Sequence, residues 1–488
     1  MSESVSRATC EHEVRYGRFV LKKTDYVQQF CHMYSRRLAQ MRAPLVRAAE
    51  EKWGLKSKGI KVLEKIIESE TSMSDSVVLV GTVYKEMELK PSVLDAYKEK
   101  NGVLGGMGGA KKVKNFASEG DVLLLEDESG RARLAGMEQF TASLVTGVTI
   151  AIKGCVKEDG SFHVQEHLTM GEYLPPAARE SSGQTQAGEP RYVLLASGLE
   201  VGAQDSSLTA VQLLVDFVCG KLGGPEQQAL SSRIVRVVLA GNSMGASPAR
   251  LSGMERFTNP ELTKKNKQTI EDFQSSSSRR LDALLCQIAV TCPVDVMPGD
   301  SDPANIIMPQ QPMHPCMLPN CSRFSTMALT TNPYEAQCGG RVLLGHSGQP
   351  LKDMLLQVPE DTDNAANTMD MDSGTGTGAD PAADTSSARA LKLLEQAVRW
   401  GNLCPTSPDS LPCYPFLQED PFVMDALPDV VFAGTMGSYA TSMVDSFAGA
   451  AAKNHRTRCI LVPSFKARGE VVLLDLTTLD TKVVTFNV

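Results

Sequence analysis

The 488-residue sequence has no apolar run that approaches the roughly 18 residues needed to cross a bilayer. Its first residues, MSESVSRATCEHEVRYG, lack the apolar stretch of a secretory signal. It also lacks any CxxC pair: the 12 cysteines are scattered, and the closest two, Cys316 and Cys321, are separated by four residues with no second pair nearby. Zinc sites need closer and repeated spacings. We therefore expect a soluble globular protein of a reducing compartment, with no membrane partner and no bound metal.

Aromatic residues and positive charge are also scarce. Phe, Trp and Tyr make up 6% of the chain, and the net charge is −8. A protein whose main role is to bind nucleic acid usually presents a basic face. Direct contact with DNA is therefore expected to be auxiliary. Three lysine clusters lie in polar stretches that we expect to be solvated surface: Lys56, Lys58 and Lys61; Lys111, Lys112 and Lys114; and Lys264, Lys265 and Lys267.

The chain is long enough for two or three domains with cores of their own. Residues 1–54 form the first segment, in which apolar residues recur every three to five positions and predict a helix over 24–53. Pro44 is predicted to kink this helix or to end it, because its ring clashes with the preceding turn and it has no N–H to donate.

Residues 55–190 are predicted to form a small β-barrel. Runs rich in β-branched residues are separated by the turn sequences EDESG and EDG, a pattern typical of short strands. Four or five such strands within about a hundred residues favour an OB-fold. Many OB-folds bind single-stranded DNA on aromatic platforms. Because aromatic residues are few here, a protein-binding or structural barrel is favoured, with single-strand binding as an alternative. The expected strands are 77–83, 122–126, 132–136 and 146–156, and residues 102–109 (GVLGGMGG) are an expected loop.

Residues 191–488 alternate between apolar strands and helices, which predicts two packed sheets with outer helices. The whole chain is therefore expected to be a multidomain α+β and α/β protein. Residues 359–387 carry seven acidic residues and neither a basic nor an aromatic one, which predicts a disordered insertion. The expected strands are 192–196, 234–240, 294–297, 327–331, 341–344, 430–433, 460–463 and 470–475, and the expected helices are 207–222, 260–290 and 388–400.

Five of these strands are followed by turns centred on glycine, where α/β proteins place their ligand-binding groups. The turns are Ser197–Glu200 (SGLE), Gly241–Gly245 (GNSMG), Pro298–Pro303 (PGDSDP), Gly345–Gly348 (GHSG) and Gly434–Gly437 (GTMG). A single turn of this kind is common in α/β proteins. Five of them in this order are a more specific indication of a protein family.

The order and spacing of the turns resemble the calcineurin-like metallophosphoesterases, whose sites read D-x-H, GD-x-x-D, GNH[DE], a lone His and G-H-x-H. In such sites a bridging carboxylate and several imidazoles hold two metal ions that orient a hydroxide for attack on phosphorus. The resemblance implies a scaffold that has lost these groups, with no catalytic residue, no cofactor and no metal. In the first motif, Gly198 and Glu200 stand for the Asp and the His, and in the second, Asn242 replaces the bridging Asp. In the third, Asp300 and Ser301 stand for the Asn and the catalytic His. In the last, Thr435 and Gly437 replace both His residues, and only His346 lies near a motif His.

An enzymatic alternative stays open from the residues alone. Glu200, Asp300, Asp302 and His346 could still hold one weakly bound ion. A residual metal-dependent phosphodiesterase or 3′–5′ exonuclease is therefore the second hypothesis.

Further stretches are similar to the B-subunits of replicative DNA polymerases (alpha, delta and epsilon), and most of all to the delta type. The resemblance implies a non-catalytic nuclear subunit for DNA replication and repair synthesis. It implies binding to the cysteine-rich C-terminal tail of the catalytic subunit and to a third, clamp-binding subunit, with DNA contacted only indirectly. The stretches are 34–42 (YSRRLAQMR), 144–154 (LVTGVTIAIKG), 212–220 (QLLVDFVCG), 293–303 (PVDVMPGDSDP), 309–319 (PQQPMHPCMLP), 331–334 (TNPY), 405–409 (PTSPD) and 413–416 (CYPF).

Overall fold

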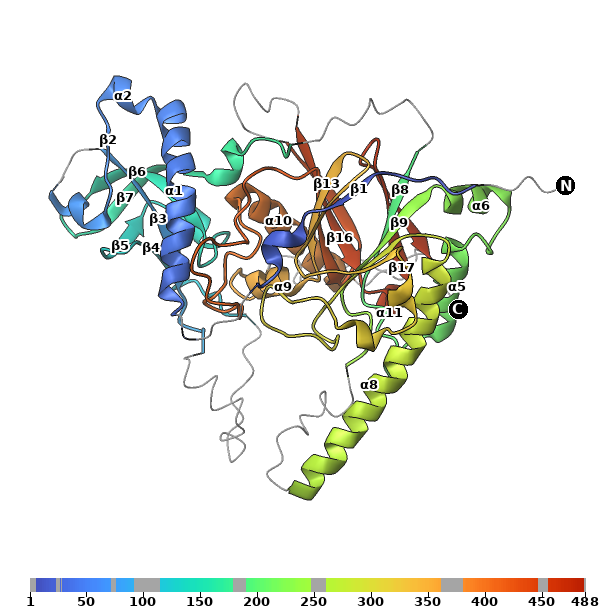
Figure 1. Ribbon diagram of the computed structural model, residues 1–488. Helices are drawn as coiled ribbons and strands as arrows, with labels where there is room; N and C mark the ends of the chain where they lie inside the picture. Colours follow the sequence, from blue (N-terminus) through green and yellow to red (C-terminus); the bar gives the residue numbers. More distant parts are fainter. Residues whose placement is uncertain are drawn as a thin grey trace, which may run out of the picture.

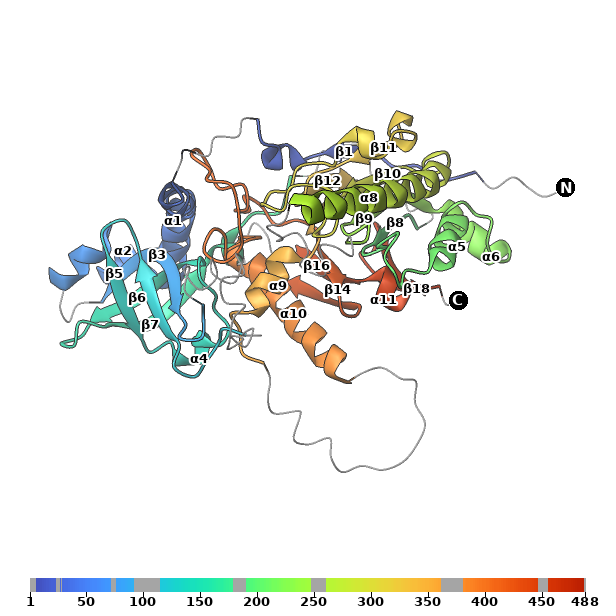
Figure 2. The ribbon, with the colours of Figure 1, turned by 90° about the horizontal axis from the view of Figure 1, so that it is seen from below.

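A computed structural model describes residues 6–22, 27, 29–71, 76–91, 115–178, 190–246, 260–360, 381–445 and 455–486. The described strands form three six-stranded sheets. One sheet closes into a barrel beside helix α1, and the other two pack face to face in a separate domain (Figures 1 and 2). The fold is thus the multidomain α+β and α/β architecture that the sequence predicts. Among the described residues no helix is both long and apolar enough to cross a membrane.

The long N-terminal helix α1 (Cys31–Trp53) packs its apolar face on the barrel. Residues 24–26 and 28 of the expected helix lie outside the described residues, and the helix begins at Cys31. The expectation that Pro44 ends the helix is wrong, because the chain stays helical to Trp53. Buried Leu45 and Trp53 follow Pro44 on the packed face, so their burial outweighs the hydrogen bond that proline removes. Gly54 then ends α1 in the left-handed conformation.

The barrel has the strand order of an OB-fold. Strand β3 pairs antiparallel with both β4 and β6, so the sheet closes on itself, and β5 pairs parallel with β7. The predicted strands are all present, and β7, with its polar sequence FHVQEHLT, is an additional one. Residues 102–109 and Lys111, Lys112 and Lys114 lie outside the described residues, whereas Lys56, Lys58 and Lys61 are exposed as expected. The elements are α2 (Leu55–Lys58), β2 (Lys61–Val62), η2 (Ile66–Thr71), β3 (Val77–Glu86), β4 (Val122–Glu126), β5 (Arg131–Ala135), α4 (Glu138–Thr141), β6 (Thr149–Val156), β7 (Phe162–Thr169) and η3 (Met170–Tyr173).

The second domain is a sandwich of two sheets with helices outside. One sheet has the order β1-β12-β13-β14-β16-β15, and the other β11-β10-β9-β8-β17-β18. Alternate residues of each strand point into the sandwich: Val193 and Leu195 join the core between the sheets, and Leu194 joins the core beneath the helices. The strands are β1 (His12–Val14), β8 (Tyr192–Ala196), β9 (Ile234–Ala240), β10 (Val294–Met297), β11 (Met327–Leu329), β12 (Tyr334–Cys338), β13 (Arg341–His346), β14 (Val430–Met436), β15 (Ala440–Asp445), β16 (Arg456–Pro463), β17 (Glu470–Asp475) and β18 (Thr481–Thr485).

Helices cover both outer faces of the sandwich. Helix α10 (Pro381–Trp400) lies on β14, β15 and β16, whereas α6 and α8 pack on the other sheet and α5 packs on both of these helices (Figure 2). The prediction of disorder over 359–387 is wrong for residues 381–387, which form the first turns of α10. The acidic and small residues of this segment gave no helical pattern in the sequence, and the helix is stabilised by its packing on the sheet. Residues 361–380 lie outside the described residues. The other helices are η1 (Tyr16–Phe19), α5 (Leu208–Val218), α6 (Pro225–Ser232), α8 (Pro260–Ala289), η5 (Pro315–Met317), η6 (Cys321–Arg323), α9 (Gln349–Leu355) and α11 (Phe465–Arg468).

Buried contacts of two cationic side chains join the barrel and α1 to the second domain. The Arg37 guanidinium donates to the Asp420 carboxylate at 2.6 Å and to the carbonyls of Pro405 and Ser407, each at 2.7 Å. On strand β3 of the barrel, the Lys85 ammonium lies 3.3 Å from the Asp121 carboxylate and donates to the Gln357 carbonyl at 2.7 Å. These side chains are fully buried. Their donors must stay paired, so they fix how the two domains meet.

Candidate functional site

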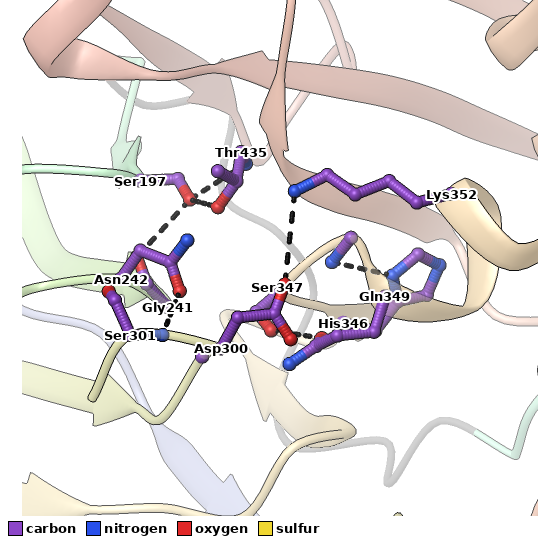
Figure 3. A network of polar contacts seen from close by, with 12 residues as sticks. Ser197, Gly241, Asn242, Asp300, Ser301, His346, Ser347, Gln349, Lys352 and Thr435 are labelled. Atoms are coloured by element: carbon purple, nitrogen blue, oxygen red, sulfur yellow. Dashed lines mark hydrogen bonds and ion pairs between the residues drawn. The ribbon is translucent and has the colours of Figure 1, made fainter. Parts of the chain in front are cut away.

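The five glycine turns meet at one edge of the sandwich. Strands β8, β9 and β10 run parallel in one sheet, and β13 and β14 run parallel in the other. Because parallel strands end at the same edge, the turns that follow them come together there. Figure 3 shows side chains from these turns within one polar network. The five turns thus lie together although they are far apart in the sequence.

Two of the turns differ from the expectation. His346 is the last residue of β13 and not part of a loop, because β13 pairs with β14 as far as Ala433. Gly434 and Thr435 belong to β14, where the pairing with β16 shifts between Ala433 and Met436. This irregularity turns Thr435 out of the regular ladder and toward the neighbouring sheet.

Ser197 links the two sheets at the site. Its hydroxyl donates to the Ala240 carbonyl at 2.7 Å and accepts from the Thr435 N–H at 2.8 Å. The Ser197 and Thr435 hydroxyl oxygens also lie 2.9 Å apart (Figure 3). Ser197 is buried, so each of these bonds is made away from water. The residue at the start of the first turn thus holds three strand ends together.

Backbone strain gathers at the site. Within the described residues four non-glycine residues have positive φ, and three of them occupy motif positions: Glu200 (45°), Asn242 (55°) and Thr435 (54°). Asn tolerates this region, but a β-branched residue such as Thr is a genuine outlier there. Each strained residue costs about 1–3 kcal/mol and persists only when its surroundings fix it. The turns therefore keep backbone shapes that their present side chains do not favour.

The second and third turns are joined through Asn242 and Asp302. The Asn242 amide oxygen accepts from the Ser301 N–H at 3.2 Å. Asp302 is buried, and its carboxylate accepts from the N–H groups of Met244, Gly299 and Ser243 at 2.8, 2.9 and 3.2 Å. Burial raises the pKa of Asp302 to about 6, against the opposing effect of these N–H donors. Both side chains thus serve as braces between loops.

His346 is fully buried beside this network. Its Nδ1 accepts from the Gly348 N–H at 3.1 Å, which assigns the ring proton to Nε2, and Nε2 has no hydrogen-bond partner among the residues that the structure describes. Burial, and then the charge of Lys352, lower the pKa of His346 to about 3. The imidazole is therefore neutral at physiological pH. Asp300, by contrast, is half-exposed, with a carboxylate oxygen 4.0 Å from the Lys352 ammonium.

The remaining motif positions make structural contacts. The Glu200 carboxylate lies 3.2 Å from the Lys466 ammonium. Gly198 has φ of 64°, and a Cβ added to it would lie 2.7 Å from Ser464 Oγ. The Gly437 carbonyl accepts from Arg468 Nε at 3.2 Å. Each of these contacts reaches α11 or the serine before it, a partner that the sequence pattern did not indicate.

Close packing fills the edge where the turns meet. A Cβ on Gly241 would lie 2.2 Å from Ser347 Cβ, and one on Gly299 would lie 2.1 Å from the Asn242 amide oxygen. Real Cβ atoms do not approach other atoms so closely. The glycines of the second and third turns are thus needed for the turns to touch each other.

Sequence reasoning missed an amide network beside His346. Asn332 Nδ2 donates to Gln310 Oε1 at 2.7 Å and to Ser347 Oγ at 2.8 Å, and Gln349 Nε2 donates to Gln310 Oε1 at 2.9 Å. Gln310 and Asn332 are fully buried. Both residues belong to stretches that are similar to polymerase B-subunits, 309–319 and 331–334. These stretches pointed to the family, but they contain no recognisable motif that would predict the network.

These donors do not fit the two-metal centre of a phosphoesterase, which needs a bridging carboxylate and several imidazoles. Asn242 offers a neutral amide oxygen that is already engaged, Gly198 offers no side chain, and Asp302 is bonded to three backbone N–H groups. Over the described ranges, no group of three or more His, Cys, Asp or Glu side chains is arranged to hold a metal ion.

The barrel and the sandwich together define a protein built from an OB-fold and a two-sheet α/β domain. Residues 29–167 match the family described as DNA polymerase delta subunit OB-fold domain, and residues 193–441 match the family of DNA polymerase alpha/epsilon B-subunits. The chain is 32% identical over 486 residues to the DNA polymerase delta small subunit of Oryza sativa subsp. japonica, covering 99% of each chain.

Two further relatives support the same family assignment. The chain is 32% identical to DNA polymerase delta subunit 2 of Drosophila melanogaster, over 99% of both chains. It is 33% identical to the DNA polymerase delta small subunit of Arabidopsis thaliana, over 96% of this chain and 94% of that one. The chain therefore belongs to the family of DNA polymerase delta small subunits, which are DNA replication proteins, and is a polymerase accessory subunit.

Proposed function

We propose that this chain is a non-catalytic scaffold subunit of a nuclear DNA polymerase delta holoenzyme, acting in DNA replication and repair synthesis. It binds the C-terminal tail of the catalytic subunit and a third subunit that carries the clamp-binding segment, and it reaches DNA only through the holoenzyme. Similarity along nearly the whole chain to delta small subunits supports the assignment.

One observation carries the non-catalytic part of the proposal. By the resemblance of its turn, Asn242 stands where a phosphoesterase has the bridging carboxylate, and its amide oxygen accepts a hydrogen bond from the Ser301 N–H. A neutral amide cannot compensate the repulsion between two dications a few ångströms apart. The same atom braces two loops. The edge where a phosphoesterase would act is, on this proposal, the part of the sandwich that holds the two sheets together.

The joint between the domains supports the scaffold role. The buried ion pair of Arg37 with Asp420 ties α1 to the sandwich, and buried Lys85, which pairs with Asp121 inside the barrel, donates across the joint to the Gln357 carbonyl. A fixed joint presents surfaces of both domains in one orientation, so that partners which touch both lose less entropy on binding. This is what a subunit that holds other subunits requires.

A pull-down with a tail deletion tests the partner assignment. The tagged full-length chain is co-expressed with the catalytic subunit of its own species, either intact or without the cysteine-rich C-terminal tail. We expect the intact catalytic subunit to co-purify and the truncated one to be lost, with the polymerase domain of the truncated subunit still active as evidence that it folds. Equal recovery of both forms would refute binding through the tail.

A nuclease assay tests the enzymatic alternative. The purified chain is incubated with Mn²⁺ and a 3′-labelled single strand, beside an Asn242→Ala variant. We expect no cleavage above buffer for either protein. Mn²⁺-dependent cleavage that the Asn242→Ala change abolishes would show that the site is an enzyme, as would anomalous density for two metal ions between Asn242 and Asp300 in Mn²⁺-soaked crystals.

A further inference from the structure

The first described residues form a strap, residues 6–14, that crosses from one sheet of the sandwich to the other (Figure 1). At its start, the Arg7 guanidinium donates to the carbonyls of Ser231 and Ile234 at 2.9 and 2.8 Å and also to that of Val218. These carbonyls border the sheet that contains β9. At its end, strand β1 pairs antiparallel with β12 in the opposite sheet. The strap therefore bridges the two halves of the sandwich.

Two cysteine sulfur atoms meet where the strap reaches the second sheet. Cys10 Sγ lies 3.2 Å from Cys338 Sγ. Cys338 ends β12, directly before a Gly339-Gly340 turn in which both residues have positive φ. The Gly339 N–H donates to the Glu11 carbonyl at 2.9 Å, so the backbone on both sides of the pair is already fixed. A disulfide needs the two sulfur atoms to approach to about 2.05 Å, a small movement from here.

The two thiols have different environments. Cys10 is partly exposed, whereas Cys338 is buried. The hydrogen bond from the Cys338 thiol, together with the positive charges of Arg236 and Arg191, lowers the pKa of Cys10 against the effect of burial. The same hydrogen bond and burial raise the pKa of Cys338 well above its ordinary value. Redox-sensitive cysteines have this combination: a partly exposed thiol with a lowered pKa next to a second thiol that can resolve it.

We propose that Cys10 and Cys338 are an oxidation site at which a peroxide closes a disulfide between the strap and β12. The Cys10 thiolate attacks one peroxide oxygen and breaks the O–O bond. Cys10 becomes a sulfenic acid, and the other oxygen leaves as hydroxide, or as water once protonated. Cys338 sulfur then attacks the Cys10 sulfur, its thiol proton joins the departing hydroxyl as water, and the S–S bond forms. The peroxide is reduced by two electrons, and the two cysteines supply them.

The bond would lock the strap in place. In the reduced protein the strap is held by hydrogen bonds and by the short strand β1, so it can open locally. A covalent link from residue 10 to residue 338 prevents that opening, and a thiol reductant reverses it. This inference does not depend on the polymerase assignment.

A peptide-mapping experiment tests the site in the intact, wild-type chain. The purified protein is treated with a small excess of hydrogen peroxide, free thiols are alkylated, and the protein is digested without reductant. We expect a cross-linked peptide that contains Cys10 and Cys338, lighter by two hydrogens than the sum of its parts and lost on reduction. Recovery of both residues as alkylated thiols, or pairing of Cys10 with other cysteines, would overturn the proposal.

Strap mobility gives a second readout with a matched control. Trypsin cleavage at Arg15 is the readout of strap opening, and we expect peroxide to slow this cleavage about tenfold or more, because the disulfide restrains the opening. Cys10→Ser should abolish the protection, and Cys316→Ser, at an exposed thiol distant in sequence, should retain it. Undiminished protection in Cys10→Ser would refute the assignment. As a folding control, both variants are also digested in the reduced state, where cleavage at the wild-type rate would show that they fold.

Discussion

Replacing Arg37 by Met removes the guanidinium that joins α1, the barrel and the sandwich while keeping most of the side-chain volume. The Asp420 carboxylate then stays buried without its cation, although it still accepts from the Phe422 N–H at 2.9 Å. The carbonyls of Pro405 and Ser407 also lose a donor. Breaking a buried pair from one side costs about 3–5 kcal/mol, since it leaves an uncompensated charge. We expect the free energy of unfolding to fall by that amount.

The assay is urea unfolding of the full chain, followed by circular dichroism and compared through apparent midpoints, because a multidomain chain need not unfold in one step. Arg36→Met is the matched control, since Arg36 is the preceding residue of the same helix and is exposed. The double variant Arg37→Met with Asp420→Asn removes the buried charge and should recover part of the loss; together with the single variant Asp420→Asn it completes a cycle that measures the coupling. The reasoning is refuted if Arg37→Met lowers the midpoint no more than Arg36→Met.

Three further predictions concern the site and the joint. His346, with a pKa of about 3 in the folded state and an ordinary value of 6.5 when unfolded, contributes stability that is present above pH 6.5 and is lost as the pH falls toward 3. Wild-type protein should therefore lose about 2 kcal/mol more than His346→Phe between pH 7 and pH 5 in urea unfolding, and parallel pH profiles would contradict this. Gly241→Ala should lower the thermal midpoint strongly, because the new Cβ would lie 2.2 Å from Ser347 Cβ and because φ at this position is 85°. Gly130→Ala is the control, since Gly130 has open space around it, and its midpoint should be unchanged. Equal midpoints for the two variants would show that the turns do not pack as described. Lys85→Met should destabilise by about 3–5 kcal/mol, because it leaves Asp121 buried without its cation. It should also speed proteolysis between the barrel and the sandwich, because it removes the hydrogen bond to the Gln357 carbonyl, and an unchanged cleavage rate would mean that the joint does not depend on this hydrogen bond.

Strands were predictable where burial on both faces left a continuous apolar signal. The runs at β8, β9 and β10 are buried except at Arg236, and their sequences are mostly Val, Leu, Ile and Ala. Strand β7 (FHVQEHLT) was missed because polar residues on its open face interrupt the pattern. Strand β12 (YEAQC) was missed because its sequence contains no β-branched residue, and it is fixed by pairing with β1 and β13.

The site was predictable in its order but not in its contacts. The five turns could be recognised because glycine must recur wherever strand ends crowd together, as Gly241 and Gly299 do. The partners could not, because they come from distant parts of the chain. Ser197 meets Thr435, and Glu200 meets Lys466, across more than two hundred residues each. Periodicity and spacing describe local structure, and they carry no information about which remote turn lies opposite.

Assembly into a polymerase is tested by the native mass of the endogenous chain in nuclear extract, measured by size-exclusion chromatography with detection of this chain and of the polymerase delta catalytic subunit. We expect the two proteins to elute together, well above the mass of the single chain, with no substantial free pool. A stable, solitary chain eluting as a monomer, with the catalytic subunit elsewhere, would contradict it.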